Sequence, residues 1–209
     1  MSEIAPYLPG LMAALGVFAV GFLVIGPNIA AIMATSMAYG RRRGLTMALG
    51  VSLGSGLWAA LTVAGLASLI TAYAGAVTVL KLFGTAFLIW LAFKSFRSAL
   101  RPDAVPPPGR ATRGNAFLAG LTIQMTNPKA ALQWIAIAAL AMDGQAPWQV
   151  GAVLVAAALI LSLIGHAAYA MVFSTGMIVT AYARARRWIE GALGLLFTTF
   201  AYRLATERT

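Results

Sequence analysis

Long apolar stretches alternate with short polar gaps along almost the whole chain. They cover residues 8–39, 45–71, 75–96, 115–142, 148–175 and 186–205. A helix that crosses a bilayer needs about 20 mostly apolar residues, and each stretch is long enough. The pattern predicts an all-α integral membrane protein with six transmembrane helices.

The longest polar gap divides the six expected helices into two groups of three. This gap is rich in proline, which disfavours helix, and it contains the run Pro106-Pro-Pro-Gly. We expect a first three-helix repeat over residues 1–100, a linker over 101–114 and a second repeat over 115–209. Because each half crosses the membrane three times, the two repeats are expected to be inverted relative to each other.

A proline interrupts the first and the fourth span at corresponding places. Pro27 follows Gly26 in span one, and Pro128 follows Asn127 in span four. Interrupted helices at matching positions of two inverted halves are the best sequence indication of a transporter's substrate site. The alternative is a pair of ordinary kinks, which transmembrane helices tolerate.

A new helical segment that begins at each proline presents free N–H groups to its surroundings. Asn127 and Pro128 have the residue types of an N-cap and a first helical position, and Gly26 permits close approach of the backbone. The positive end of a helix dipole favours an anion such as the α-carboxylate of an amino acid.

The candidate substrate-binding residues lie at or near the two breaks. Lys129, a base well inside a span, either adds positive charge to a carboxylate site or neutralises carbonyl groups at the break. Trp134 is expected to face a cavity. The full set is Gly26, Pro27, Asn28, Gln124, Asn127, Pro128, Lys129, Gln133 and Trp134.

Two further residues are candidates for proton coupling. His166 lies in span five, and an imidazole titrates near neutral pH, so it either relays a proton or is a hydrogen-bonded residue of the bundle. Glu190 lies one turn after Arg186 and Arg187, where an ion pair at the surface is the simpler interpretation.

Composition and charge narrow the classes of function. Hydrophobic residues make up 61% of the chain, and the formal net charge is +10. The bases occur in short clusters between apolar runs, which excludes a nucleic-acid-binding face and indicates membrane topology. Eleven of the fifteen bases fall on one side of a six-span path. Basic residues are enriched on the cytoplasmic side of membrane proteins, so we expect this side, which includes the linker, to be cytoplasmic. Both termini are then expected to lie outside.

An enzyme is the least favoured class. The chain has no cysteine, which excludes disulfide and thiolate chemistry, and no cofactor is indicated. Gly50-Val-Ser52-Leu-Gly54 matches a hydrolase motif formally, but small residues four apart on a membrane helix favour close packing. An intramembrane serine hydrolase that uses Ser52 or Ser55 with His166 remains the alternative from another class.

The residues around the breaks resemble the LysE-type amino-acid exporters, especially the RhtB (homoserine/threonine efflux) branch. The spacing and order of motifs agree over nearly the whole chain. The matching stretches are Gly26-Pro27-Asn28 with Gly-Arg-Arg-Arg-Gly at 40–44, residues 80–97, Thr126-Asn127-Pro128-Lys129-Ala130, and residues 186–204. Gly54-Ser55-Gly56 stands where family members often carry an acidic residue.

The resemblance implies a secondary-active exporter of amino acids or related metabolites in a bacterial cytoplasmic membrane, driven by the proton gradient. A metal-cation exporter of the same superfamily is the nearest rival, but the chain has one histidine and no acidic cluster within the spans. The expected partners are a small amino-acid-like substrate and the lipid bilayer, and the sequence leaves open whether two chains form a homodimer.

Overall fold

The described part of the chain folds into helices without strands. The computed structural model describes residues 4–72, 76–101, 113–141, 146–174 and 176–206. A short 3-10 helix, Ala5–Tyr7, comes first. The α-helices are α1 (Leu8–Gly21), α2 (Pro27–Tyr39), α3 (Arg41–Ala72), α4 (Ala76–Ala99), α5 (Ala116–Met125), α6 (Pro128–Ala141), α7 (Trp148–Val172) and α8 (Gly176–Thr206).

The first and the fourth expected spans are each divided in two, as the prolines predict. Residues 22–26 separate α1 from α2, and residues 126 and 127 separate α5 from α6. Proline has no N–H to donate, so the helix before each break cannot continue through it, but proline suits the first position of the next helix. Each half therefore has the same order of elements, namely two short helices followed by two long ones.

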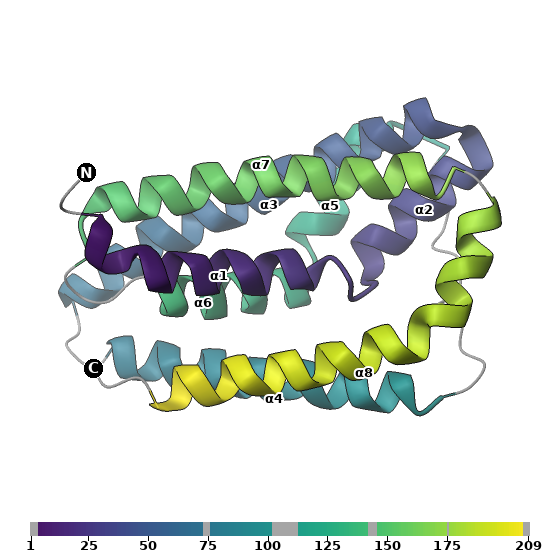
Figure 1. The fold of residues 1–209 in the computed structure, drawn as a ribbon. Helices are drawn as coiled ribbons and strands as arrows, with labels where there is room; N and C mark the ends of the chain where they lie inside the picture. Colours follow the sequence, from purple (N-terminus) through teal and green to yellow (C-terminus); the bar gives the residue numbers. More distant parts are fainter. Residues whose placement is uncertain (1–3, 73–75, 102–112, 142–145, 175, 207–209) are drawn as a thin grey trace.

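The helices form an elongated bundle in which both breaks lie in the middle (Figure 1). α3 packs against α5 and α7, α1 packs against α6, and α4 packs most extensively against α8. A large apolar core joins buried residues of α1, α4, α6, α7 and α8, and a smaller one lies around Ile32, Met47 and Val51 of α2 and α3.

The two ends of the bundle differ in charge. The start of α1 and the end of α8 lie at one end (Figure 1). At the other end, Arg43 donates a hydrogen bond to the carbonyl of Arg113, and Arg186 donates one to the carbonyl of Ser98. The expected basic clusters that the structure describes therefore lie together, opposite the ends of the chain.

The outer surface is strongly apolar. Leu82, Phe93 and Ile164 are each more than 60% exposed, and many other large apolar side chains point outward. Two described helices, Arg41–Gly65 within α3 and Trp148–Val172, are long and apolar enough to cross a membrane on length and composition. The apolar helices Ala5–Gly21, Ala116–Met125 and Pro128–Ala141 are shorter. The count of six spans stays a prediction.

Most expected boundaries agree with the helices, with one clear difference. α8 begins at Gly176, ten residues before the expected start at residue 186, because the basic cluster continues as helix and does not interrupt it. Most of the Pro-rich linker, residues 102–112, lies outside the described residues.

Candidate functional site

The start of α6 has the local geometry that the sequence predicts. The side-chain oxygen of Asn127 accepts a hydrogen bond of 3.0 Å from the backbone N–H of Lys129, and Pro128 occupies the first helical position. Asn127 is therefore an N-cap, which satisfies one of the free N–H groups at this helix end.

The start of α2 is built differently. Gly26 is the extended residue before the helix, and Pro27 occupies the first helical position. A Cβ atom on Gly26 would lie 3.1 Å from Oδ1 of Asn28 and 3.6 Å from Nζ of Lys129. Glycine thus lets a polar group from each broken helix approach the backbone closely.

The segment between α1 and α2 is held by side chains from the other half of the chain. Nζ of Lys129 donates a hydrogen bond of 3.3 Å to the carbonyl of Val24, and the hydroxyl of Tyr169 donates one of 2.5 Å to the carbonyl of Phe22. Lys129 thus contacts one carbonyl group at the break, and its role toward a substrate carboxylate stays a prediction.

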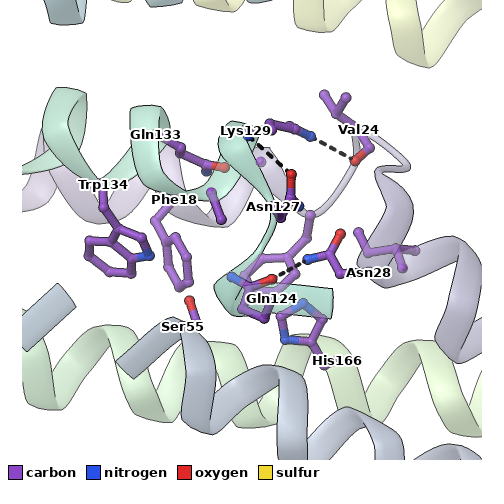
Figure 2. A pocket seen from close by; sticks show the side chains of 14 residues that line it. Phe18, Val24, Asn28, Ser55, Gln124, Asn127, Lys129, Gln133, Trp134 and His166 are labelled. Carbon is purple, nitrogen blue, oxygen red and sulfur yellow. Dashed lines mark hydrogen bonds between the residues drawn. The ribbon is translucent and has the colours of Figure 1, made fainter. Parts of the chain in front are cut away.

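A small, partly open cavity lies between the two breaks (Figure 2). Its volume is about 30 Å³, which is roughly the share of liquid volume that one water molecule occupies. Six helices contribute to its wall. The lining residues are Phe18, Gly21, Phe22, Val24, Asn28, Ile29, Ser55, Gln124, Asn127, Lys129, Ala130, Gln133, Trp134 and His166.

Polar contacts at the cavity join the two halves of the chain. Nδ2 of Asn28 donates a hydrogen bond of 3.0 Å to Oε1 of Gln124, as Figure 2 shows. The indole N–H of Trp58 donates one of 3.1 Å to the backbone carbonyl of Gln124. Gln124 is 3% exposed, so both bonds are shielded from solvent. The end of α5 is thereby tied to α2 and to α3.

Aromatic rings form an apolar wall of the cavity. The ring of Phe18 packs against the ring of Phe22 and, at a centroid distance of 4.9 Å, against that of Trp134. Beside them, a Cβ atom on Gly21 would overlap the side-chain amide of Gln133. The expectation that Trp134 faces a cavity is confirmed.

His166 lies against the cavity in a network of serines. Its Nδ1 atom is 3.0 Å from the carbonyl oxygen of Ser162 and 3.3 Å from the hydroxyl of Ser52. The hydroxyl of Ser162 lies 3.1 Å from the same atom, so Nδ1 donates to the carbonyl in one tautomer and accepts from a serine hydroxyl in the other. The hydroxyl of Ser52 donates to the Ser162 carbonyl at 3.0 Å. In that bond the proton of Ser52 points away from the imidazole, which does not fit a nucleophile and its base.

Ser55 contributes a different kind of group. It is 1% exposed and lines the cavity, and its hydroxyl oxygen has no hydrogen-bond partner among the described residues. The sequence indicated Ser55 only as a packing residue or a hydrolase candidate. Its position facing the cavity depends on how α3 packs beside α5, which no local motif encodes.

The structure brings most of the predicted substrate residues together. Six of them line the cavity, namely Asn28, Gln124, Asn127, Lys129, Gln133 and Trp134. The other three, Gly26, Pro27 and Pro128, set where α2 and α6 begin. Phe18, Phe22 and Ile29 also line the cavity and were not predicted, because nothing in an apolar run distinguishes a residue that faces a cavity from one that faces lipid.

Glu190 does not line this cavity, and it is buried, whereas the sequence favoured an ion pair at the surface. It is 6% exposed and lies between α4 and α8, with Ser95 and Ser98 beside its carboxyl group. Arg186 is equally buried, and its guanidinium donates to the hydroxyl of Ser98 at 2.7 Å. The close packing of α4 on α8, which spacing within one helix does not reveal, buries both charges.

Metal chemistry finds no support in the described part of the chain. Those residues contain no group of three or more His, Cys, Asp or Glu side chains that could hold a metal ion. The cavity offers hydroxyl, amide and ammonium groups instead.

Proteins of similar sequence indicate which family the chain belongs to. No solved structure matches the chain. The Escherichia coli K12 membrane protein YahN is 30% identical over 194 residues, which cover 92% of this chain and 87% of that protein. The threonine efflux protein of Escherichia coli K12 is 27% identical over 88% of this chain and 91% of its own length.

A leucine efflux protein of Klebsiella pneumoniae is 31% identical over 88% of this chain and 89% of its own length. The LysE type translocator family matches residues 19–208, which include both breaks and every residue that lines the cavity except Phe18. The chain therefore belongs to the LysE type translocator family, as a membrane transporter and not an enzyme.

Proposed function

We propose that this protein is a secondary-active exporter of neutral amino acids, which works by alternating access across a bacterial cytoplasmic membrane. The observation that carries the proposal is the meeting of two proline-led helix starts, α2 and α6, at one buried cavity beside Lys129. Relatives named for the efflux of threonine and leucine support the class of substrate.

The carboxylate of the substrate binds at the starts of α2 and α6. Both helices direct the positive ends of their dipoles toward the region of the cavity, and Lys129 adds a full positive charge. Lys129 then exchanges its hydrogen bond with the Val24 carbonyl for one with the carboxylate. A hydrogen bond between two charged groups of this kind is roughly twice as strong as one between neutral groups.

The ammonium group of the substrate faces the opposite helix ends. α1 ends at Gly21 and α5 ends at Met125, so the negative ends of two helix dipoles lie on the other side of the breaks. The hydroxyl of Ser55 and the side-chain oxygen of Gln133 are neutral acceptors that line the same space. A zwitterion is thus matched at both of its charges.

The side chain of the substrate is expected to be neutral. With His166 neutral, Lys129 is the one charged side chain among the described residues that line the cavity. A second charge on the substrate would be buried without a partner, which is costly. Phe18, Phe22 and Trp134 provide an apolar wall against which an aliphatic side chain packs.

The cavity must widen before an amino acid enters. Its volume of about 30 Å³ is far below the roughly 300 Å³ or more of typical ligand sites. The six spans are arranged as two inverted three-helix repeats, and rocking of one repeat against the other opens the cavity to each side in turn. The hydrogen bond between Asn28 and Gln124 joins the two repeats in the closed state and breaks when they separate.

Export is coupled to the proton gradient through His166. In the tautomer whose Nδ1 donates to the carbonyl of Ser162, the lone pair of Nε2 takes up a proton when the site is open to the acidic side. Glu190 is the second candidate, since its buried carboxyl group lies near both Arg186 and Lys129. Replacement of His166 by Gln should abolish the effect of a pH gradient on transport while exchange of substrate without a gradient continues.

The test is an efflux assay with purified protein in liposomes that contain a mixture of labelled amino acids. An imposed pH gradient should drive the loss of neutral amino acids and leave acidic and basic ones inside. The variant Lys129→Gln should lower the rate at least tenfold, because a hydrogen bond to a charged group is worth about 1.5–3 kcal/mol.

The variant Arg203→Gln serves as the control, because it also replaces one positive charge by a neutral amide. Arg203 is exposed and does not line the cavity. Equal rates for the two variants, or retention of every amino acid by folded wild-type protein, would contradict the proposal.

A further inference from the structure

A second, larger hollow lies on the outer face of the bundle between α4 and α8, away from the substrate cavity. Its volume is about 750 Å³. These two helices run side by side, and α8 bends so that its first turns cross the end of the bundle (Figure 1). The lining residues are Phe96, Ala99, Leu100, Arg184, Arg187, Trp188, Gly191, Ala192 and Leu195, which we call the α4–α8 groove.

The floor of the α4–α8 groove is apolar and open. Trp188 is 84% exposed, Leu100 is 78% exposed and Leu195 is 66% exposed. A Cβ atom on Gly191 would meet no other atom within 4 Å, so glycine at this position deepens the groove. Large apolar side chains around an empty space of this size fit a hydrocarbon chain.

The rim of the groove is positively charged. Arg184 and Arg187 are both exposed, and none of the described residues that line the groove is acidic. Nε of Arg187 donates a hydrogen bond of 3.3 Å to the carbonyl of Ala99, which holds the guanidinium beside α4. Arg186, between them in sequence, instead turns inward to Ser98. Two of the three arginines in this cluster are thus directed outward at the groove.

We propose that the α4–α8 groove binds an anionic phospholipid of the cytoplasmic leaflet. The phosphate binds Arg184 and Arg187, and an acyl chain lies along Phe96, Leu100 and Leu195. Trp188 has the amphipathic ring that is typical of the boundary between hydrocarbon and headgroups. Basic pockets between helices on the cytoplasmic side are known to select anionic headgroups. The choice of leaflet rests on the proposed function and on the orientation expected from the sequence, in which the basic clusters face the cytoplasm.

A second copy of the chain is the other occupant to consider. A twofold interface places the same surface patch of each copy against its partner. If the groove lay at the centre of such an interface, Arg184 and Arg187 of one copy would face those of the other, with no acidic group among the described lining residues to separate them. The positive charge of the two arginines therefore favours a lipid phosphate over a second copy of the chain as the occupant of the groove.

The test is a titration of purified protein in detergent with phosphatidylglycerol, followed by native mass spectrometry, with phosphatidylethanolamine as the zwitterionic comparison. Wild-type protein should retain phosphatidylglycerol preferentially. The double variant R184Q/R187Q should weaken that retention about 25-fold, since each arginine near a charged surface contributes roughly a factor of five. The control R41Q/R42Q removes two exposed bases at the same end of the bundle and should leave retention unchanged.

A second pair of variants tests the floor of the groove with all arginines present. Gly191→Leu should fill the space and prevent retention, whereas Gly65→Leu, at another glycine with no atom within 4 Å of an added Cβ, should have no effect. Equal retention of the two lipids, or full retention by R184Q/R187Q, would overturn the proposal. So would a dimer that dissociates in the same variants. None of these measurements depends on transport, so a negative result would overturn the lipid site without contradicting the proposed function.

Discussion

Ser55 places a buried hydroxyl group in the cavity between the two breaks, without a hydrogen-bond partner among the described residues. A polar group left unsatisfied in this way costs about 1–3 kcal/mol. Ser55→Ala should therefore leave the stability of the protein unchanged or raise it by about 1 kcal/mol. If the hydroxyl accepts from the substrate, the same change should raise the KM for efflux several-fold in the liposome assay.

Ser52 provides the matched control, three residues earlier on the same helix. Its hydroxyl donates to the carbonyl of Ser162, so Ser52→Ala should lower the free energy of unfolding by about 1 kcal/mol. The melting temperature should then fall in Ser52→Ala and stay the same or rise in Ser55→Ala. Unchanged efflux kinetics in Ser55→Ala would show that this hydroxyl does not contact the substrate.

Individual residues differ in how far the sequence determines them. The N-cap at Asn127 was predictable because its partner, the N–H of Lys129, lies two residues away. The bond between Asn28 and Gln124 spans 96 residues and exists only because α2 and α5 meet in the bundle. The same reason explains Lys129, whose carbonyl partner, Val24, lies in the other half of the chain.

The division of one span into α5 and α6 allows a test at the scale of the element. Asn127→Ala removes the N-cap of α6 and should cost about 1 kcal/mol of stability. Because the same helix start lines the cavity, we expect efflux to fall by more than tenfold while the amount of inserted protein changes little. Pro128→Ala should act in the same direction. Quantitative immunoblots of membranes beside the efflux rate separate the two effects.

Asn115 offers a control of the same chemistry. Its side-chain oxygen caps α5 by accepting from the N–H of Leu118 at 3.1 Å, and it lies outside the cavity. Asn115→Ala should therefore lose similar stability but retain efflux. If both asparagine variants lose efflux equally, the start of α6 has no special role in transport.

Close packing of α3 on α5 leads to a second prediction for these elements. A Cβ atom on Gly120 would overlap the backbone carbonyl of Met47, and one on Gly50 would overlap that of Phe117. Gly120→Val should therefore separate the helices and destabilise the protein by several kcal/mol, as overpacking of a backbone contact does. Thermal aggregation assays in detergent should show the loss.

Gly114 is the comparison, because an added Cβ there meets nothing within 4 Å. Gly114→Val should have a melting temperature within a few degrees of wild type. A large loss of stability in this variant would indicate that valine acts on the backbone conformation and not through helix packing.

The small-residue pattern around Gly50 predicted a close helix contact, but it did not identify α5 as the partner. Glu190 illustrates the same limit, because only the packing of α4 on α8 reveals that it is buried.

At the scale of the whole molecule, the charge pattern and the positions of the ends are consistent with each other. The start of α1 and the end of α8 lie at one end of the bundle, and the described basic clusters lie at the other (Figure 1). The sequence predicted this separation because apolar runs fix the number of crossings and bases mark one side. Which end faces the cytoplasm depends on the membrane, so it is a question for experiment.

The absence of cysteine from the chain makes that experiment direct. Single cysteines placed at Ala5, Thr206, Arg101 or Gly114, all of which are exposed, carry the only thiol of the protein. In intact cells, a maleimide that cannot cross the membrane should label Ala5→Cys and Thr206→Cys but not Arg101→Cys or Gly114→Cys. All four should be labelled after the membrane is permeabilised.

Each pattern of labelling has a distinct structural meaning. Labelling of the first pair alone requires an even number of crossings with both ends outside, as two inverted repeats of three spans demand. Labelling of the second pair alone would invert the molecule and place the arginine clusters outside, against the positive-inside rule. Labelling of only one of Ala5→Cys and Thr206→Cys would require an odd number of crossings. In that case one broken helix would enter and leave on the same side, and the substrate site could not lie between two spans of opposite direction.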